Sequence, residues 1–396
     1  MINRLEIKRE DRWIFCGDDV NFFLQENSQI KKKSFLLRIY PGITLLLILG
    51  FFKLVFLYII QKISNTNNEL YDHLVFETYE SHMHQNYFKF YNPDKNISYR
   101  GVNIFDKKSY TSIHWIPLKV LIKNLAANLK SFKKNVEYLP PSFFNLLFRK
   151  AMNSIAPYSY LNALFSKINI YNPTIKVFTS GPYIAGCAAT SAGLETIYFA
   201  HGFSVKFFAM PAYSSVVVYS DEERAEYQSY LGHSKVSLFP ISEIKEMNQS
   251  IIIFLESRDD WLPIGDMSGL ITFFQKKQYK IVVKAHPYNP DSEILQKLSK
   301  IYHIDVCSDH LLTGIEVIQK YKPRFAAGWT STTACESLRS GVIFISLAET
   351  TNQYYERTIY PMAKRCLSWD REKDVIEHAT VDMKNYIADL KLIRSR

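Results

Sequence analysis

The chain has 396 residues, more than one typical hydrophobic core organises, so two domains are expected. Apolar residues make up 47% and charged residues 22%, which excludes wholesale disorder. The formal net charge of +10 favours phosphate-rich partners, either nucleotides or an anionic membrane surface. No RNA-recognition, zinc-finger or helix-turn-helix signature accompanies this charge, so we expect no nucleic-acid partner.

The cysteines are odd in number and scattered, and most lie inside apolar runs. They are Cys16, Cys187, Cys307, Cys335 and Cys366. This pattern predicts buried free thiols in a reducing compartment. The cysteines lack metal-ligand spacing, and the cluster Glu80, His82 and His84 has no further ligand pair at helical spacing. We therefore expect no metal site and no cofactor.

A very apolar run covers residues 42–60 and is interrupted only by Lys53. Basic residues flank it at 31–33, Arg38 and Lys62. The run has roughly the length that spans a bilayer. A predicted strand precedes it and belongs to a cytosolic α/β domain, so we favour a helix that lies on an anionic membrane surface. A membrane-spanning helix and an ordinary buried helix remain alternatives.

The first 150 residues carry weak signals. Strands are predicted at Trp13–Cys16 and His73–Phe76, and acidic turns follow both. Residues 85–140 are rich in Asn, Lys, Tyr and Ser, which predicts loops with one or two amphipathic helices, one of them at Ile116–Leu129.

From Pro173 onward, short β-branched runs alternate with helical segments. Strands are predicted at 174–178, 196–199, 215–219 and 235–239, with helices at 183–192 and 221–231. After a polar linker at 241–249 the alternation resumes, with strands at 250–255, 279–284 and 302–307 and helices at 269–277, 291–299 and 313–320. Such alternation predicts parallel sheets covered by helices. Because GxGxxG and Walker A sequences are missing, a dinucleotide dehydrogenase and a P-loop enzyme are disfavoured.

The stretch 324–347 reads as strand, Gly/Ser/Thr turn, helix, Gly341 and strand. The turn and helix start contain Thr330, Ser331, Thr332 and Thr333. Hydroxyls and N–H groups at a helix start form a phosphate cradle, and Glu336, one turn further on, can accept hydrogen bonds from ribose. The pattern resembles the donor-binding element of GT-B glycosyltransferases. An ordinary strand–turn–helix–strand unit with a Thr-rich cap is the alternative.

The sequence Lys284-Ala-His286-Pro287 is predicted to follow a strand. It resembles the His-Pro motif of bacterial CMP-sugar transferases, the sialyltransferases and capsule Kdo transferases. The resemblance implies that His286, fixed by Pro287, stabilises the donor phosphate as the nucleotide leaves. A histidine packed at a domain edge is the alternative. Arg258 follows the first strand of the second domain, where it either pairs with phosphate or lies in a solvated turn.

His201-Gly202 ends another predicted strand, where His201 suits a general base for an acceptor hydroxyl and Gly202 leaves room for substrate. Here the sequence departs from the sialyltransferases, which have an acidic residue before the glycine. It resembles instead the polyol-phosphate transferases of teichoic acid synthesis and the UDP-sugar epimerases. The base therefore remains open between His201 and an acidic residue. The acidic candidates are Asp18, Asp19, Glu77 and Glu80.

The sequence thus predicts an α/β protein of GT-B type, with two Rossmann-like domains facing across a cleft. Residues 1–240 form the acceptor-side domain, 250–375 the nucleotide-donor domain, and 376–396 a helix that packs back toward the first domain. The expected activity is an inverting, metal-independent glycosyltransferase that moves a CMP-activated acidic sugar onto a surface polysaccharide or lipopolysaccharide. The expected partners are the nucleotide-sugar donor, a glycan or glycolipid acceptor, and the cytoplasmic face of the bacterial inner membrane. The alternatives are a CDP-polyol phosphotransferase, a UDP-sugar epimerase or transferase, and a non-catalytic scaffold.

Overall fold

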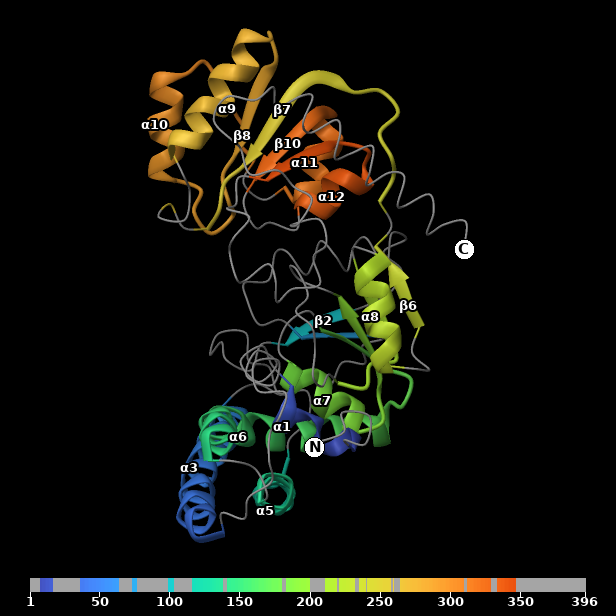
Figure 1. Cartoon of the computed structure of the whole chain (residues 1–396). Helices are drawn as coiled ribbons and strands as arrows, with labels where there is room; N and C mark the ends of the chain where they lie inside the picture. The colour runs from blue at the N-terminus through green and yellow to red at the C-terminus, as the bar shows by residue number, and fades with distance from the viewer. Residues whose placement is uncertain are drawn as a thin grey trace. The chain divides into compact units, whose positions relative to one another are not determined.

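The computed structural model describes residues 8–16, 36–63, 73–76, 99–102, 116–137, 141–179, 183–199, 211–218, 221–231, 235–239, 241–257, 259, 264–309, 312–328 and 333–346 (Figure 1). The chain divides into two compact units. Almost all of the described residues up to Ser237 belong to the first unit, and the second continues from Leu238.

The first unit contains a six-stranded sheet in the order β2-β1-β3-β4-β5-β6. Its strands are β1 (His73–Phe76), β2 (Tyr99–Val102), β3 (Lys176–Thr179), β4 (Glu195–Phe199), β5 (Ser215–Val218) and β6 (Lys235–Leu238). The neighbours from β2 to β5 pair in parallel. β3 and β4 are buried along nearly their whole length. Their runs of β-branched and aromatic residues are typical of parallel strands that are covered on both faces.

The first unit has six described α-helices, which are α1 (Arg12–Phe15), α3 (Leu36–Ile63), α5 (Leu118–Val136), α6 (Pro141–Tyr171), α7 (Tyr183–Ser191) and α8 (Asp221–Leu231). All of them except α8 contribute residues to one apolar core, which also includes Val177 of β3. α5 buries one residue per turn, from Leu121 to Val136, and exposes most of its lysines on the opposite side. The amphipathic helix predicted at Ile116–Leu129 is therefore confirmed, and it extends further than expected.

The strand predicted at Trp13–Cys16 is wrong. A 3-10 turn, η2 (Arg9–Asp11), leads instead into the single helical turn α1. Trp13, Ile14 and Phe15 are all buried, because α1 contacts both α6 and α7 and apolar groups surround it. The Trp13 ring stacks on Tyr158 of α6 at a centroid distance of 4.9 Å. A run of adjacent buried apolar residues has no period that separates strand from helix, so the contacts decided the conformation.

The sequence patterns gave no sign of the 31-residue helix α6 or of the edge strand β2. α6 contains Pro157, which lacks the N–H that an interior helical position donates. Burial of Ile155, Leu161 and Phe165 on either side of the proline sustains the helix in spite of that loss.

The second unit contains a five-stranded, fully parallel sheet in the order β11-β10-β7-β8-β9. Its strands are β7 (Asn248–Phe254), β8 (Lys280–Lys284), β9 (Asp305–Val306), β10 (Pro323–Gly328) and β11 (Ile343–Ser346). Its helices are α9 (Ile264–Lys276), α10 (Glu293–Ile301), α11 (Gly314–Tyr321) and α12 (Thr333–Arg339). β7 is the first strand and lies in the middle, which is the strand order of a Rossmann-type sheet.

Helices lie on both faces of this sheet, with α9 and α10 on one side and α11 and α12 on the other (Figure 1). Ile251 and Ile253 of β7 join the core that contains residues of α9 and α10. The opposite face is covered by α11 and α12, which contact β7, β10 and β11. Two parallel, helix-covered sheets confirm the predicted α/β class.

Local signals set the ends of several elements. Thr313 caps α11 in a reciprocal capping box with Glu316. Gly193 and Gly341 end α7 and α12 with φ of 83° at both, a left-handed conformation that favours glycine. Other boundaries shifted: β9 is only two residues long, and β7 begins inside the expected linker. The predicted C-terminal helix at 376–396 lies outside the described residues.

Candidate functional site

The carboxyl edge of the second sheet contains the point where the strand order reverses. From β7 the chain runs to β8 and β9 on one side, and then to β10 and β11 on the other. The carboxyl ends of β7 and β10 are therefore adjacent, with Ala327 opposite Ile253. In open parallel sheets this switch point is where ligands bind. Here it is flanked by the segment after Phe254 and the one after Gly328.

Gly328, the last residue of β10, lies tightly against its neighbours. A Cβ at this position would be 3.3 Å from the Phe344 ring and 3.5 Å from the Phe254 carbonyl oxygen. The segment that follows contains Thr330, Ser331 and Thr332, which lie outside the described residues. The predicted phosphate cradle at 330–333 therefore remains a prediction, although its last member, Thr333, is the first residue of α12 and is buried.

His286 and Pro287 lie directly after β8, at the same edge, as predicted. The backbone N–H of Tyr288 donates to His286 Nδ1 at 3.2 Å, and the N–H of Asn289 donates to the His286 carbonyl oxygen at 2.9 Å. Because Nδ1 accepts, the neutral imidazole carries its proton on Nε2. The turn at 286–289 thus fixes both the ring and its tautomer, and it makes Nε2 a hydrogen-bond donor.

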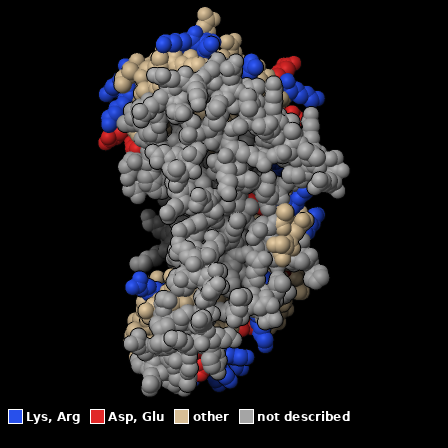
Figure 2. Space-filling view, viewed as in Figure 1, with Lys and Arg blue, Asp and Glu red and all other residues tan. Residues whose placement is uncertain are grey.

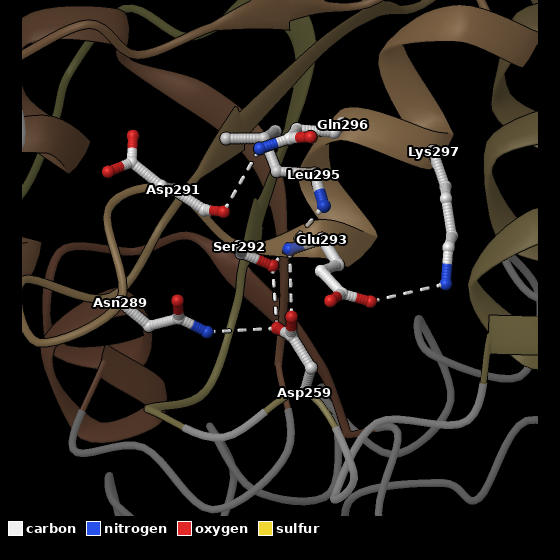
Figure 3. Close-up of polar contacts among 8 residues, drawn as sticks. All are labelled: Asp259, Asn289, Asp291, Ser292, Glu293, Leu295, Gln296 and Lys297. Carbon is white, nitrogen blue, oxygen red and sulfur yellow. Dashed lines mark hydrogen bonds and ion pairs between the residues drawn. The ribbon is translucent and has the colours of Figure 1, made fainter.

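Asp259 connects the segment after β7 to the segment after β8 (Figure 3). Its carboxylate accepts hydrogen bonds from Asn289 Nδ2 at 3.0 Å, Ser292 Oγ at 2.6 Å and the Glu293 N–H at 2.8 Å. Ser292 is itself the N-cap of α10 and accepts from the Leu295 N–H. Asp259 therefore stabilises the start of α10 and holds the turn that contains His286. Its neighbour Arg258 lies outside the described residues, so its predicted phosphate contact remains a prediction.

Glu336 lies in α12, one turn after Thr333, as predicted, but the residue is only 2% exposed. It packs against Gly314 at the start of α11, where an added Cβ would be 2.2 Å from Glu336 Oε2. Oε2 has no hydrogen-bond partner among the described residues. Burial, and then the charge of Glu316, raise the pKa of Glu336 to about 8. The carboxyl is therefore mostly protonated at neutral pH and can donate as well as accept a hydrogen bond.

Lys284 is a site candidate that sequence reasoning missed. It is the last residue of β8, is buried, and donates from Nζ to the Ala285 carbonyl oxygen at 3.0 Å. Burial lowers the pKa of its ammonium, and the charges of Cys307 and Asp309 oppose that shift. A lysine at the carboxyl end of the apolar run 281–283 was the available signal, because buried amines with perturbed pKa values concentrate at functional sites.

Several other predicted site residues lie outside the described part of the chain. His201 and Gly202 lie outside the described residues, as do the acidic alternatives Asp18, Asp19, Glu77 and Glu80. In the described part of the chain, no three His, Cys, Asp or Glu side chains gather in a way that would hold a metal ion. Cys16, Cys187 and Cys307 are buried free thiols, as predicted.

Comparisons with known proteins give structural similarities only. No protein-family model matches the chain, and no curated protein matches it. The chain resembles a UDP-GlcNAc 2-epimerase from Neisseria meningitidis bound to UDP-GlcNAc, with a TM-score of 0.40 and 9% identity over 81% of this chain and 91% of that one.

Two further solved structures are similar at the same level. The Methanocaldococcus jannaschii UDP-GlcNAc 2-epimerase gives a TM-score of 0.39 and 9% identity over 79% of this chain and 99% of that one. The Phytolacca americana UGT2, complexed with UDP-2fluoro-glucose and pterostilbene, gives a TM-score of 0.38 and 8% identity over 79% of this chain and 93% of that one.

Proposed function

We propose that the protein is a glycosyltransferase that uses a nucleotide-sugar donor, and that the donor binds at the carboxyl edge of the second sheet. The observation that carries this proposal is the fixed turn at His286, beside the switch point of a Rossmann-type sheet. A donor N–H at that edge suits a phosphate group, and Lys284 adds positive charge at the end of the same strand.

The proposed reaction transfers the sugar with inversion and without a metal. A base, His201 or a nearby carboxylate, removes the proton of an acceptor hydroxyl. The hydroxyl oxygen forms a bond to the anomeric carbon as the bond from that carbon to the donor phosphate oxygen breaks. His286 Nε2–H stabilises the negative charge that grows on the departing phosphate, and the segment at 330–333 binds the same phosphate. Glu336 takes no part in this step, because its side chain is buried and packs against Gly314, and its ribose contact stays a prediction of the sequence.

The first choice of donor is a CMP-activated acidic sugar, because the His-Pro turn and the downstream Ser/Thr segment match that pattern. The acceptor is a surface polysaccharide or lipopolysaccharide at the cytoplasmic face of the bacterial inner membrane. The His-Gly pair at 201–202 favours a second candidate, a CDP-polyol phosphotransferase, which would break the phosphoanhydride bond and release CMP. A UDP-sugar epimerase or transferase is the third candidate.

The test is a thermal-shift and calorimetry panel on the full chain with CMP, CDP, UDP and UDP-GlcNAc. A ligand that binds only the folded state raises the melting temperature. We expect CMP to stabilise the wild type, and His286→Ala to weaken that binding by about 1.5–3 kcal/mol. His303→Ala is the matched control. His286 follows the carboxyl end of β8, whereas His303 lies before the amino end of β9 and so away from the proposed donor site.

Each outcome separates the candidates. Binding of UDP species without CMP would contradict the cytidylate assignment and leave a UDP-sugar enzyme. Binding of none of the nucleotides would contradict the transferase proposal and favour the scaffold. Equal CMP affinity in wild type and His286→Ala would remove His286 from the donor site.

A further inference from the structure

The surface of α3 is apolar on two opposite sides, and in the part of the chain that the structure describes α5 and α6 cover one of them. Leu46, Gly50 and Leu54 recur every four residues and are buried against α5 and α6. At Gly50 the helices approach so closely that a Cβ would be 2.9 Å from Leu125 Cδ1 of α5. The inner side of α3 is therefore part of the core of the first unit.

The outer side of α3 carries large apolar side chains that no described residue covers. These residues are Leu45, Leu47, Ile48, Leu49, Phe51, Phe52, Phe56 and Ile59. Phe52 and Phe56 are exposed by 66% and 52%, and Val120 and Ile122 of α5 are also exposed. Soluble monomers rarely expose a continuous apolar surface of this extent, because the cost in water grows with its area.

The charges of this helical layer are of one sign. Neither α3, α5 nor α6 contains an Asp or Glu. α5 exposes lysines one or two turns apart on its outer side, at positions 119, 123, 130 and 134. Acidic groups do occur at its margins, since Asp11 accepts a hydrogen bond from Ser131 and Glu137 follows the end of α5.

The second unit has basic residues too, but their setting differs. Figure 2 shows Lys and Arg atoms over the part of the second unit that holds α9 and α10, with acidic atoms beside them. Lys280 pairs with Asp305 at 2.6 Å, and Lys297 pairs with Glu293 at 3.6 Å. The lysines of the second unit thus have acidic neighbours, whereas α3, α5 and α6 contain no acidic residue. The positive charge beside the exposed apolar side of α3 is therefore a feature of this helical layer and not only of a basic chain.

We propose that the outer side of α3, together with the lysine side of α5, is a membrane-binding surface for an anionic lipid bilayer. The aromatic and aliphatic side chains enter the acyl boundary, and the lysines contact anionic headgroups. This inference rests on the first unit alone and holds whichever reaction the second unit catalyses.

The helix lies along the membrane surface rather than across the bilayer. By length and composition, Gly42–Ile59 passes a test for a membrane span, a test that core helices of soluble proteins also pass. A span would have to separate α3 from α5 and α6, which would uncover the packing at Gly50. It would also break the bond from Lys53 Nζ to the Met152 carbonyl oxygen of α6, at 2.7 Å. Unpaired, that ammonium is costly inside a bilayer.

The test is co-sedimentation of the full chain with vesicles of phosphatidylcholine alone and of phosphatidylcholine with phosphatidylglycerol. We expect binding to the anionic vesicles that weakens with salt. Phe52→Ser/Phe56→Ser should reduce this binding by about tenfold or more. Ile301→Ser/Val306→Ser in the second unit, at positions exposed by 69% and 43%, is the matched control and should bind as the wild type.

The charge contribution is tested in the same way. Lys119→Glu/Lys123→Glu should lower affinity for the anionic vesicles by about tenfold or more, whereas Lys276→Glu/Lys300→Glu should not. All of these positions are exposed, so unchanged melting temperatures would show that the variants fold.

Three results would overturn the inference. Wild-type protein that binds neither vesicle removes the membrane as the partner. A chain that forms dimers in light scattering, and becomes monomeric only with Phe52→Ser/Phe56→Ser, would assign the surface to a second copy. Retention in cell membranes after an alkaline carbonate wash would indicate a spanning helix and contradict the in-plane placement.

Discussion

Glu336 is a carboxyl group that folding places where its charge is unfavourable. In the unfolded chain its pKa has the ordinary value of 4.5, and in the folded chain burial raises that pKa to about 8. Below the lower value both states hold the proton. Between the two values only the unfolded state loses it, so stability falls as pH rises, by about 1.4 kcal/mol for each pH unit.

Glu336→Gln removes this titration while keeping the shape of the side chain. We expect the melting temperature of the variant to rise relative to wild type between about pH 5 and about pH 8, because only the wild type loses stability over that window. Thermal unfolding across the pH range is the measurement. Glu293→Gln, at an exposed position, should show no such trend. A difference between Glu336→Gln and wild type that does not change with pH would mean that Glu336 is ionised in the folded state.

At the scale of elements, Asp259 determines how α10 begins. Its carboxylate accepts hydrogen bonds from the side chains of Asn289 and Ser292 and from the backbone N–H of Glu293. That N–H lies in the first turn of α10, where it has no acceptor within the helix. The same segment holds the His286 turn. Asp259 is therefore a positioning residue that connects helix stability to the candidate site.

Asp259→Ala should destabilise the second unit by about 1–3 kcal/mol, because it leaves these donors without their acceptor. Hydrogen exchange of the α10 amides, which should become faster, is the direct measurement. Glu293→Gln is again the control, since the surface pair of Glu293 with Lys297 is worth about 0.5 kcal/mol or less. Equal exchange rates in both variants would show that Asp259 does not hold α10.

At the scale of the whole molecule, each unit has its own apolar core. Trp13 lies in the core of the first unit, and Phe274 lies in a core of the second, where it packs against Tyr279 and Phe325. Because the two clusters share no residue, a core defect in one unit should act on that unit.

Trp13→Ala and Phe274→Ala should each cost about 3–5 kcal/mol, and calorimetry of the full chain should show that they lower two different transitions. Limited proteolysis would then cleave first in the unit that carries the substitution. A single transition that both variants lower equally would show instead that the units unfold together.

Much of the second unit could be predicted from sequence because its signals are local. β7 and β8 are short apolar runs between turn residues. At the start of α11 the side chains of Thr313 and Glu316 each accept a hydrogen bond from the other's backbone N–H, and Gly341 adopts a left-handed conformation after α12. The position of His286 at a strand end followed from the same alternation. Conformational preferences over a few residues are sufficient for such features. The hydrogen bonds of the cap and the turn close locally, and the apolar runs identify the strands even though their hydrogen bonds join distant segments.

The tertiary structure decided what depends on distant contacts. Trp13–Phe15 is helical because α6 and α7 surround it, and α6 continues through Pro157 because both sides of that proline are buried. The strand order that creates the switch point, the burial of Lys284 and Glu336, and the binding of Asp259 to α10 all join segments far apart in the chain. Sequence by itself therefore determined the α/β alternation and the residues at the strand ends. Only the packing of one segment against another decided their order, burial and protonation, because desolvation and close packing arise once distant groups meet.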